Sequence, residues 1–253
     1  MRRKRFGQHF LHDAGVLAKI VAAIDPNPGD RLVEIGPGEG ALTRRLLERV
    51  ERMEAIEIDR DLAARLEGEF PPQRLHLLRQ DALECDFSVF GEGLRIVGNL
   101  PYNISTPLLF HLAQYAGRVR DMHFMLQREV VERMVAAPSG ADYGRLSVSL
   151  QARFRMRKLF TVARGAFRPP PKVDSCVVLL EPRDAAAELG IADRATFLRF
   201  ASAAFRHKRK TLRNNLAPLY GADRVDRLPE AGQRAEALSV AELAAIFTRL
   251  SSS

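Results

Sequence analysis

Short apolar runs alternate with amphipathic stretches of helical period between about residues 31 and 183. The helical stretches are ALTRRLLERV, RDLAARLEGEF, STPLLFHLAQYA and REVVERMV, and the apolar runs are RLVEIG, RMEAIEI, LHLLRQ, LRIVG, MHFML, KLFTVA and CVVLLE. Most of these runs are almost continuously apolar, which is typical of strands covered on both faces. The alternation predicts an α/β fold with a doubly wound, Rossmann-like sheet.

The pattern changes near the end of this region. The last two strand candidates are joined by a proline-rich connection, FRPPPKVDS, which predicts a hairpin that adds an antiparallel edge to the sheet. Residues 185–253 show helical periodicity, and Ser239 and Glu242 form the sequence pattern of a capping box. We therefore expect two domains, 1–183 with the sheet and 184–253 as a small all-helical domain. Thr106-Pro107 predicts a helix start within the first.

Composition narrows the function classes. The formal net charge is +8 and the sequence pI about 10.0, which favours a polyanionic partner such as nucleic acid. The two cysteines, Cys85 and Cys176, form no Cys-x-x-Cys pair, and the six histidines show no ligand spacing. We expect neither a metal site nor a disulfide framework. The basic start of the chain is interrupted by polar residues and no run approaches a membrane span, so we expect a soluble, cytoplasmic protein.

Three successive strand ends carry residues suited to a nucleoside. Gly36, Gly38 and Gly40 follow the first strand and would let backbone pass close to a ligand. Glu57, near the end of the second strand, could accept hydrogen bonds from ribose hydroxyls; Asp59 is the competing acid, better placed to cap the next helix. Asp81 follows the third strand as a base-edge acceptor or a turn residue. Phosphate fits less well, since Glu39 lies inside the glycine loop and no Gly-Lys-Ser/Thr follows it.

GNLPYN ends the fourth strand at the same edge. Its amide, Asn99, and the carbonyl of Leu100, held by Pro101, could accept the two N–H groups of an exocyclic nucleobase amine. Such contacts would prepare the nitrogen lone pair for an activated methyl group, and Tyr102 offers a face for stacking the base. A strand-end turn made by asparagine and proline is the plain structural alternative.

In this order, FGQHFL, VEIGPGEGALT, AIEID, QDAL, GNLPYN and FRPPPKVDS resemble the ribosomal RNA adenine dimethyltransferase family over nearly the whole chain. YGRLSVSLQ and FRHKRKTLRNNL resemble the branch that acts on bacterial small-subunit (16S) RNA. The resemblance implies S-adenosylmethionine as methyl donor and dimethylation of two adjacent adenines in a loop near the 3′ end of that RNA. It also implies a monomer that acts on a partly assembled 30S particle as a biogenesis factor.

The resemblance also implies site residues. The cofactor positions are His9, Leu11, Gly36, Glu57, Asp81 and Asn99, with Gly38 from the glycine loop. The target-base positions are Asn99, Leu100, Pro101 and Tyr102, with Phe167 as a second stacking face. His9 departs from the asparagine usual in the family, and it could make cofactor affinity depend on pH.

Two basic segments are expected to bind RNA. The first is the N-terminal arm, and the second is a segment in which Arg206, Lys210 and Arg213 would share one helix face. The residues are Arg3, Lys4, Arg5, Arg206, Lys208, Arg209, Lys210 and Arg213. Three alternatives stay open: a 23S RNA methylase of the macrolide-resistance type, a small-molecule methyltransferase, and a non-enzymatic ribosome-binding protein.

Overall fold

A computed structural model describes residues 8–251 of the chain. By its internal contacts the chain divides into two compact units. Unit 1 comprises Met1–Val131 and Arg157–Pro182, and unit 2 comprises Glu132–Met156 and Arg183–Ser253. The predicted division after residue 183 lies one residue from the last of the three boundaries, between Pro182 and Arg183, whereas the segment 132–156 lies with unit 2. The two-domain division itself stays a prediction.

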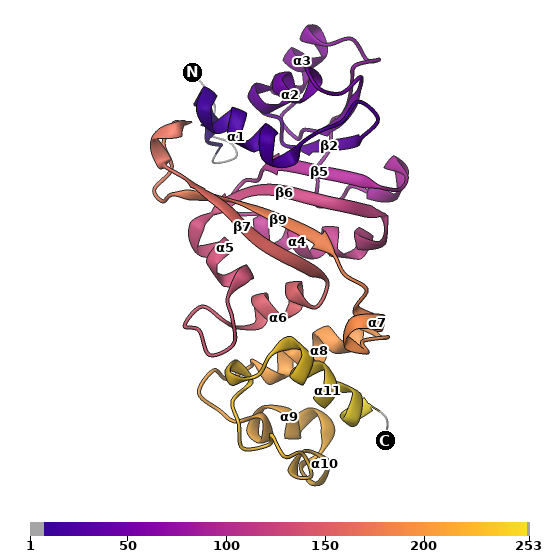
Figure 1. Cartoon of the computed structure of the whole chain (residues 1–253), viewed down its shortest axis with the longest axis vertical. Helices are drawn as coiled ribbons and strands as arrows, with labels where there is room; N and C mark the ends of the chain where they lie inside the picture. The colour runs from indigo at the N-terminus through magenta and orange to yellow at the C-terminus, as the bar shows by residue number, and fades with distance from the viewer. Residues whose placement is uncertain (1–7, 252–253) are drawn as a thin grey trace. The chain divides into compact units, whose positions relative to one another are not determined.

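Unit 1 is built on a seven-stranded sheet with the order β4-β3-β2-β5-β6-β9-β7 (Figure 1). The first five strands in this order are parallel, and β9 runs antiparallel to β6. The strands are β2 (Arg31–Ile35), β3 (Met53–Ile56), β4 (Leu75–Leu78), β5 (Leu94–Asn99), β6 (Val119–Gln127), β7 (Phe154–Val162) and β9 (Ser175–Pro182). All seven strands predicted from the apolar runs are therefore present, and the antiparallel edge is confirmed.

Helices cover this sheet between its strands. They are α1 (Ala14–Ile24), α2 (Ala41–Leu47), α3 (Arg60–Glu69), α4 (Ser105–Leu112) and α5 (Arg128–Val135), with the short 3₁₀ turns η1 (Phe87–Phe90) and η2 (Ala113–Arg118). Leu17 and Leu46 pack with Val97 and Met125 in one core cluster on one face of the sheet. The neighbouring strand residues Ile96 and Phe124, which face the other side, are also fully buried. Because both faces of the sheet are buried, the residues on both sides of most strands are apolar, and these strands appear in the sequence as continuous apolar runs.

The start of α4 differs from the prediction. The helix begins at Ser105, and Pro107 is its third residue rather than its first. Proline is tolerated there because the N–H groups of the first helical turn have no partner within the helix. The predicted cap, Thr106, therefore lies inside the helix.

The hairpin between β7 and β9 carries a small second sheet. Its connection contains η3 (Arg164–Ala166) and β8 (Phe167–Arg168), and β8 pairs antiparallel with β1 (Phe10–Leu11). Phe10 lies opposite Arg168 and Leu11 opposite Phe167. This pairing fixes the N-terminal segment beside the hairpin and at the opening of the cavity described below.

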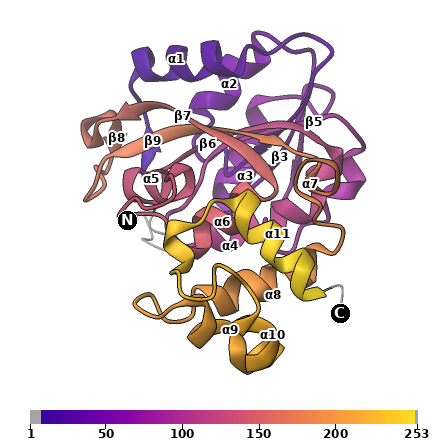
Figure 2. The same ribbon diagram turned by 60° about the horizontal axis from the view of Figure 1, so that its bottom comes forward.

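Unit 2 is helical (Figure 2). Its elements are α6 (Arg145–Gln151), α7 (Ala185–Leu189), α8 (Arg194–Ala204), α9 (Leu212–Tyr220), α10 (Ala222–Asp226), η4 (Ala235–Ala237) and α11 (Val240–Ser251). Phe197, Phe200 and Phe247 form an aromatic group at its core. The predicted capping box is confirmed: Ser239 N donates to Glu242 Oε2 over 2.8 Å, and Glu242 N donates to Ser239 Oγ over 3.2 Å. Within residues 8–251, no helix is long and apolar enough to cross a membrane.

Candidate active site at the carboxyl ends of the strands

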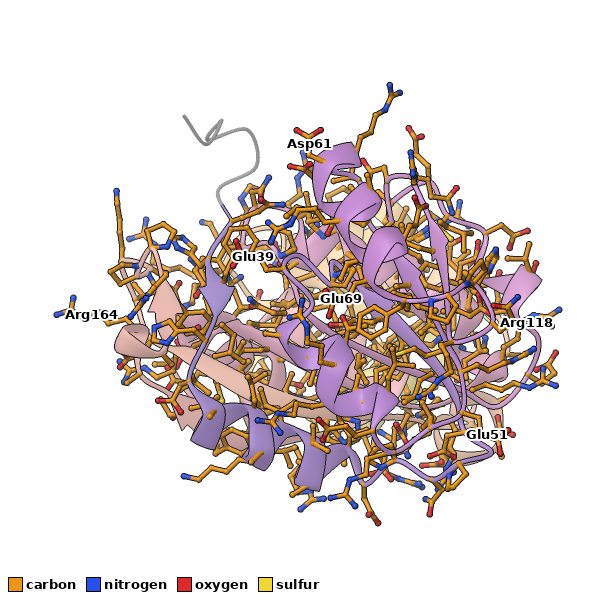
Figure 3. The ribbon with its side chains drawn as sticks, turned by 90° about the horizontal axis from the view of Figure 1, so that it is seen from above. Glu39, Glu51, Asp61, Glu69, Arg118 and Arg164 are labelled. Carbon is orange, nitrogen blue, oxygen red and sulfur yellow. The ribbon has the colours of Figure 1, made fainter. Side chains whose placement is uncertain are left out.

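A cavity of about 320 Å³ lies where the parallel strands of unit 1 end. This size lies at the lower end of the range for small-molecule sites. Its lining includes residues from the ends of β2, β3 and β5, the turn after β4, and the N-terminal segment 8–11. Figure 3 looks down on this part of the molecule, with Glu39 labelled. The predicted convergence of strand ends at one edge is therefore present.

The glycine loop forms one wall of the cavity. Gly36, Gly38 and Gly40 have φ values of 66°, 58° and 79°, a region that side-chain-bearing residues rarely adopt. A Cβ at Gly38 would lie 3.1 Å from the ring of Phe10, and one at Gly40 would lie 2.6 Å from Leu66. The positive φ values favour glycine in this loop, and a side chain at Gly38 or Gly40 would also crowd Phe10 of β1 or Leu66 of α3.

Glu57 is buried at the end of β3 and is held by backbone N–H groups. Its Oε2 accepts from Gly38 N over 3.0 Å, and its Oε1 accepts from Asp59 N over 2.9 Å. Burial raises the pKa of Glu57, while these two hydrogen bonds act in the opposite direction. Asp59 instead caps α3, accepting from the N–H groups of Asp61 and Leu62. The predicted capping role of Asp59 is confirmed.

A second buried carboxyl group, Glu34, was not singled out in the sequence. It lies on β2, is 2% exposed, and lines the cavity. Thr43 Oγ1 donates to its Oε2 over 2.7 Å. Burial, together with repulsion from Glu57, raises the pKa of Glu34 to about 7. The sequence signal was an acid inside the otherwise apolar run LVEI, where a lone charged residue is rarely left without a function or a partner.

Asp81 has the predicted turn role, and its role as a base-edge acceptor stays a prediction. Its Oδ1 accepts from Leu83 N over 2.9 Å, which closes the turn after β4, and its side chain also lines the cavity. Glu34, Glu39 and Glu57 complete a set of four acids in the lining. Among the residues that the structure describes, no lysine or arginine lines this cavity. A cavity of this composition, in a chain of net charge +8, favours a cationic ligand and disfavours phosphate.

The GNLPYN segment forms the rim beside β1. Asn99 Nδ2 donates to the carbonyl of His9 over 2.9 Å, and Leu100 N donates to the carbonyl of Met125 over 3.1 Å. Asn99, Leu100, Pro101 and Tyr102 all line the cavity. The segment is thus fixed on one side by β6 and on the other by the N-terminal strand.

Tyr102 is held at both its hydroxyl and its ring. The hydroxyl forms a hydrogen bond with Ser175 Oγ over 2.8 Å, and the ring lies 5.7 Å from that of His9, centroid to centroid. His9 Nδ1 in turn donates to the carbonyl of Pro169 over 2.7 Å. Burial raises the pKa of Tyr102, so the phenol is neutral near pH 7.

The structure does not bring every predicted residue to the cavity. Leu11 lines it, but Phe167 is 2% exposed, absent from the lining, and packed in the core cluster that contains Leu11. The expectation that Phe167 offers a second stacking face is wrong for this geometry, because its pairing opposite Leu11 turns the ring into the core. Arg3, Lys4 and Arg5 lie outside the described residues.

The basic segment of unit 2 also differs from the prediction. Helix α8 ends at Ala204 and α9 begins at Leu212, with Thr211 as its cap, so residues 206–210 form a connection between helices. Arg206, Lys210 and Arg213 therefore do not share one helix face. Asn215 holds the connection by donating to the carbonyls of Ala204 and His207. Arg213 makes a two-pronged ion pair with Asp226.

Comparison with known proteins gives consistent matches over the whole chain. The sequence model of the family described as ribosomal RNA adenine dimethylase matches residues 1–252. A protein of Thiobacillus denitrificans named ribosomal RNA small subunit methyltransferase A is 57% identical over 249 residues, covering 98% of this chain and 97% of the relative. A protein of the same name from Nitrosomonas europaea is 53% identical, covering 98% and 96%.

Solved structures show the same fold. A dimethyladenosine transferase from Plasmodium falciparum is similar with a TM-score of 0.81 and 26% identity, covering 96% of each chain. The 23S rRNA methyltransferase ErmE is similar with a TM-score of 0.71 and 24% identity, covering 96% of this chain and 99% of the other. At this identity the second likeness concerns the fold alone.

Proposed function

The chain belongs to the ribosomal RNA adenine dimethylase family, and from this premise we propose that it transfers methyl groups to two adjacent adenines of small-subunit (16S) ribosomal RNA. The product is a pair of dimethyladenosines in the 3′-terminal hairpin loop, and the donor is S-adenosylmethionine. The curated relatives at 53–57% identity carry the small-subunit name, which favours this RNA over the 23S RNA of the structural relative ErmE.

The acidic lining of the cavity is the observation that best supports this donor. S-adenosylmethionine supplies a methyl group activated by a positively charged sulfonium. Four carboxyl groups and no lysine or arginine, among the described lining residues, suit a ligand that carries a sulfonium and an ammonium group but no phosphate. A nucleotide would meet repulsion from Glu39 and Glu57 at the same wall.

The chain's own residues hold the donor at three strand ends. Glu57, held by Gly38 N and Asp59 N, presents the remaining lone pairs of its carboxylate to the ribose hydroxyls. Gly36 and Gly38 bring backbone close to the ligand, and Asp81 accepts from the adenine amine. His9, Leu11 and Asn99 close the opposite side of the cavity.

The rim orients the acceptor amine. Because Asn99 Nδ2 is occupied by the His9 carbonyl, Oδ1 is the atom of this planar amide that serves as acceptor for an adenine N–H. The Leu100 carbonyl, restricted by Pro101, accepts the second N–H. These contacts favour a tetrahedral amine with its lone pair toward the methyl group, and Tyr102 stacks on the base. The proton released after transfer passes to water.

Two basic segments of the chain are proposed to bind the RNA. We assign Arg206, Lys208, Arg209, Lys210 and Arg213, and the arm Arg3, Lys4 and Arg5, to backbone phosphates. The substrate is a partly assembled 30S particle in the cytoplasm, and the enzyme acts as a monomer. Residues 1–183 form the catalytic domain and residues 184–253 the RNA-docking domain. The protein is thereby also a factor of small-subunit biogenesis.

A choice of acceptors tests this function against its rivals. Labelled S-adenosylmethionine would be offered with small subunits that lack the modification, with large-subunit RNA, or with free adenosine. We expect incorporation with small subunits only. Incorporation into large-subunit RNA would favour a resistance-type methylase, and transfer to adenosine a small-molecule enzyme. Binding of the donor without transfer to any acceptor would favour a non-enzymatic ribosome-binding protein.

A further inference from the structure

One stretch of the chain carries a net charge of +8, which equals the net charge of the whole chain. Residues 143–173 contain eight lysines and arginines and no aspartate or glutamate. This leaves 31 of the 39 basic residues, which balance the 31 acidic residues. The stretch is therefore a third concentration of basic charge, beside the two basic segments on which the sequence prediction depended.

Five of these cations are exposed on unit 1. They follow β7 and its hairpin to β9, and we call them the basic band: Arg157, Lys158, Arg164, Arg168 and Lys172. Arg157 and Lys158 lie on β7, which is the last strand in the order of the sheet. Because successive residues of a strand face opposite sides, these two place positive charge on both sides of the sheet edge. Arg164 projects outward from the hairpin (Figure 3).

The basic band leads directly to the opening of the cavity. Arg168 lies opposite Phe10 in the pairing of β8 with β1, and the next carbonyl, of Pro169, accepts from His9. His12 N also donates to the carbonyl of Ala166 over 3.0 Å. His9, Phe10 and Leu11 line the cavity. The band is therefore continuous with the rim at which the target base is proposed to bind.

The length of the basic band suits a nucleic acid. At about 3.3 Å per residue, the extended chain from Arg157 to Arg164 covers on the order of 20 Å, over which an RNA strand presents several phosphates. Two acids close to the band have contacts elsewhere. Asp174 accepts from the backbone N–H of Arg164 and lies 3.9 Å from Arg128, and Glu39 faces the cavity. The exposed guanidinium and ammonium groups of the band give the outer surface of the hairpin a positive potential.

We propose that the basic band binds the sugar–phosphate backbone of the ribosomal RNA that flanks the loop carrying the target adenines. This inference rests on the proposed function and adds to it a docking surface on the catalytic unit, separate from residues 206–210 of unit 2. The band positions the RNA without reading its sequence, since guanidinium and ammonium groups bind phosphates in any sequence. The alternative is that charge on an edge strand only prevents pairing with other molecules.

The test compares two triple variants of equal charge. Arg157→Gln/Lys158→Gln/Arg164→Gln removes three charges from the band, and Arg49→Gln/Arg52→Gln/Arg65→Gln removes three exposed charges near β3 and α3, toward the other end of the sheet. Methylation of small subunits would be measured as kcat and KM at several salt concentrations, and donor affinity by calorimetry. We expect the band variant to raise KM about tenfold or more, with kcat and donor Kd unchanged. The slope of log KM against log salt should fall by about 2 to 3.

Each outcome decides the proposal. A band variant with the KM and salt slope of the wild type overturns it and leaves edge protection as the role of these charges. An equal rise of KM in the control variant also overturns it, because the effect would then be one of net charge. If the triple variant binds the donor more weakly than the wild type, the single variant Arg164→Gln is measured in its place. The slope of log KM against log salt should then fall by just under 1. An unchanged slope overturns the proposal. A wild-type protein that does not methylate small subunits refutes the proposed function instead.

Discussion

The side chain of Asn99 donates a hydrogen bond to the backbone carbonyl of His9, with 2.9 Å between Nδ2 and O. The two residues are 90 positions apart, and the contact joins the end of β5 to the N-terminal segment that pairs with the hairpin. It also sets the direction of the amide, since one end is engaged and the other is left as acceptor. The rim at which we propose that the target base binds is therefore built from distant parts of the chain.

Replacing Asn99 tests whether its side chain is needed for methyl transfer. We expect Asn99→Ala to lower kcat by at least about 100-fold, as is typical when an oriented hydrogen-bonding group at a reacting centre is removed. Asn214→Ala, an exposed change on α9, is the control and should retain full activity. Single-turnover methylation of small subunits measures the effect. Normal turnover by the Asn99→Ala protein would show that Asn99 is not required for methyl transfer.

Two changes at Tyr102 distinguish its ring from its hydroxyl. Tyr102→Phe loses only the hydrogen bond to Ser175, so kcat/KM should fall less than about tenfold. Tyr102→Ala also loses the stacking face, which is worth about 1–3 kcal/mol per base, and should cost more. Steady-state kinetics on the same particles compares them. Equal losses in both variants would argue that Tyr102 acts through Ser175 and not by stacking.

A pair of acid-to-amide changes tests the choice between Glu57 and Asp59. Glu57→Gln should weaken donor binding about 10- to 100-fold, because a charge-assisted hydrogen bond to ribose is replaced by a neutral one. Asp59→Asn should leave the donor Kd nearly unchanged, since asparagine also caps helices well. Calorimetry with S-adenosylmethionine measures both. The reverse ranking would make Asp59 the ribose acid.

Glu34 should make stability depend on pH. Its pKa in the folded protein is about 7 against an ordinary value of 4.5, so between these pH values the folded state keeps a proton that the unfolded state has released. The contribution of this group to stability is therefore fully present below pH 4.5 and is lost as the pH rises to about 7, by about 3 kcal/mol in all. Glu34→Gln lacks this ionisation and should exceed the wild type in unfolding free energy at pH 8 but not at pH 4.5.

Urea titrations of both proteins at these two pH values measure the difference. Thr43 can donate to glutamine as it does to Glu34, so the substitution keeps the hydrogen bond. A difference in unfolding free energy that is the same at both pH values would show that Glu34 ionises normally.

The connection between α8 and α9 should contribute to RNA binding more than Arg213 does. Lys208→Gln/Arg209→Gln/Lys210→Gln should raise KM for small subunits and reduce its salt dependence. Arg213→Gln should have a smaller effect, because its guanidinium is already paired with Asp226. Kinetics at two salt concentrations compares the variants. A larger effect of Arg213→Gln would place the RNA on α9 instead.

The sequence predicted the sheet and most of the cavity for one physical reason. Parallel strands end at a common edge, so residues that follow successive strands, such as Gly36, Glu57, Asp81 and Asn99, must lie together. The failures involve contacts that local patterns do not contain. Phe167 is buried by the pairing of β8 with β1, 156 residues apart, which no periodicity indicates.

Two further differences had signals in the sequence. Thr211 is a cap residue before LRNNL, and it marks the start of a new helix where a continuous helical face was predicted. The basic band lies within an acid-free run of 31 residues, but its cations are more widely spaced along the chain than those at 206–210.

The central claim is that this chain dimethylates two neighbouring adenines of small-subunit RNA. The most direct measurement incubates small subunits that lack the modification with labelled S-adenosylmethionine and locates the methyl groups by mass spectrometry, with Asn99→Ala run beside the wild type. The account predicts dimethyladenine at two adjacent positions in the 3′-terminal hairpin loop, absent with the variant. Methyl groups on another base, on another RNA, or nowhere although the donor binds, would contradict it.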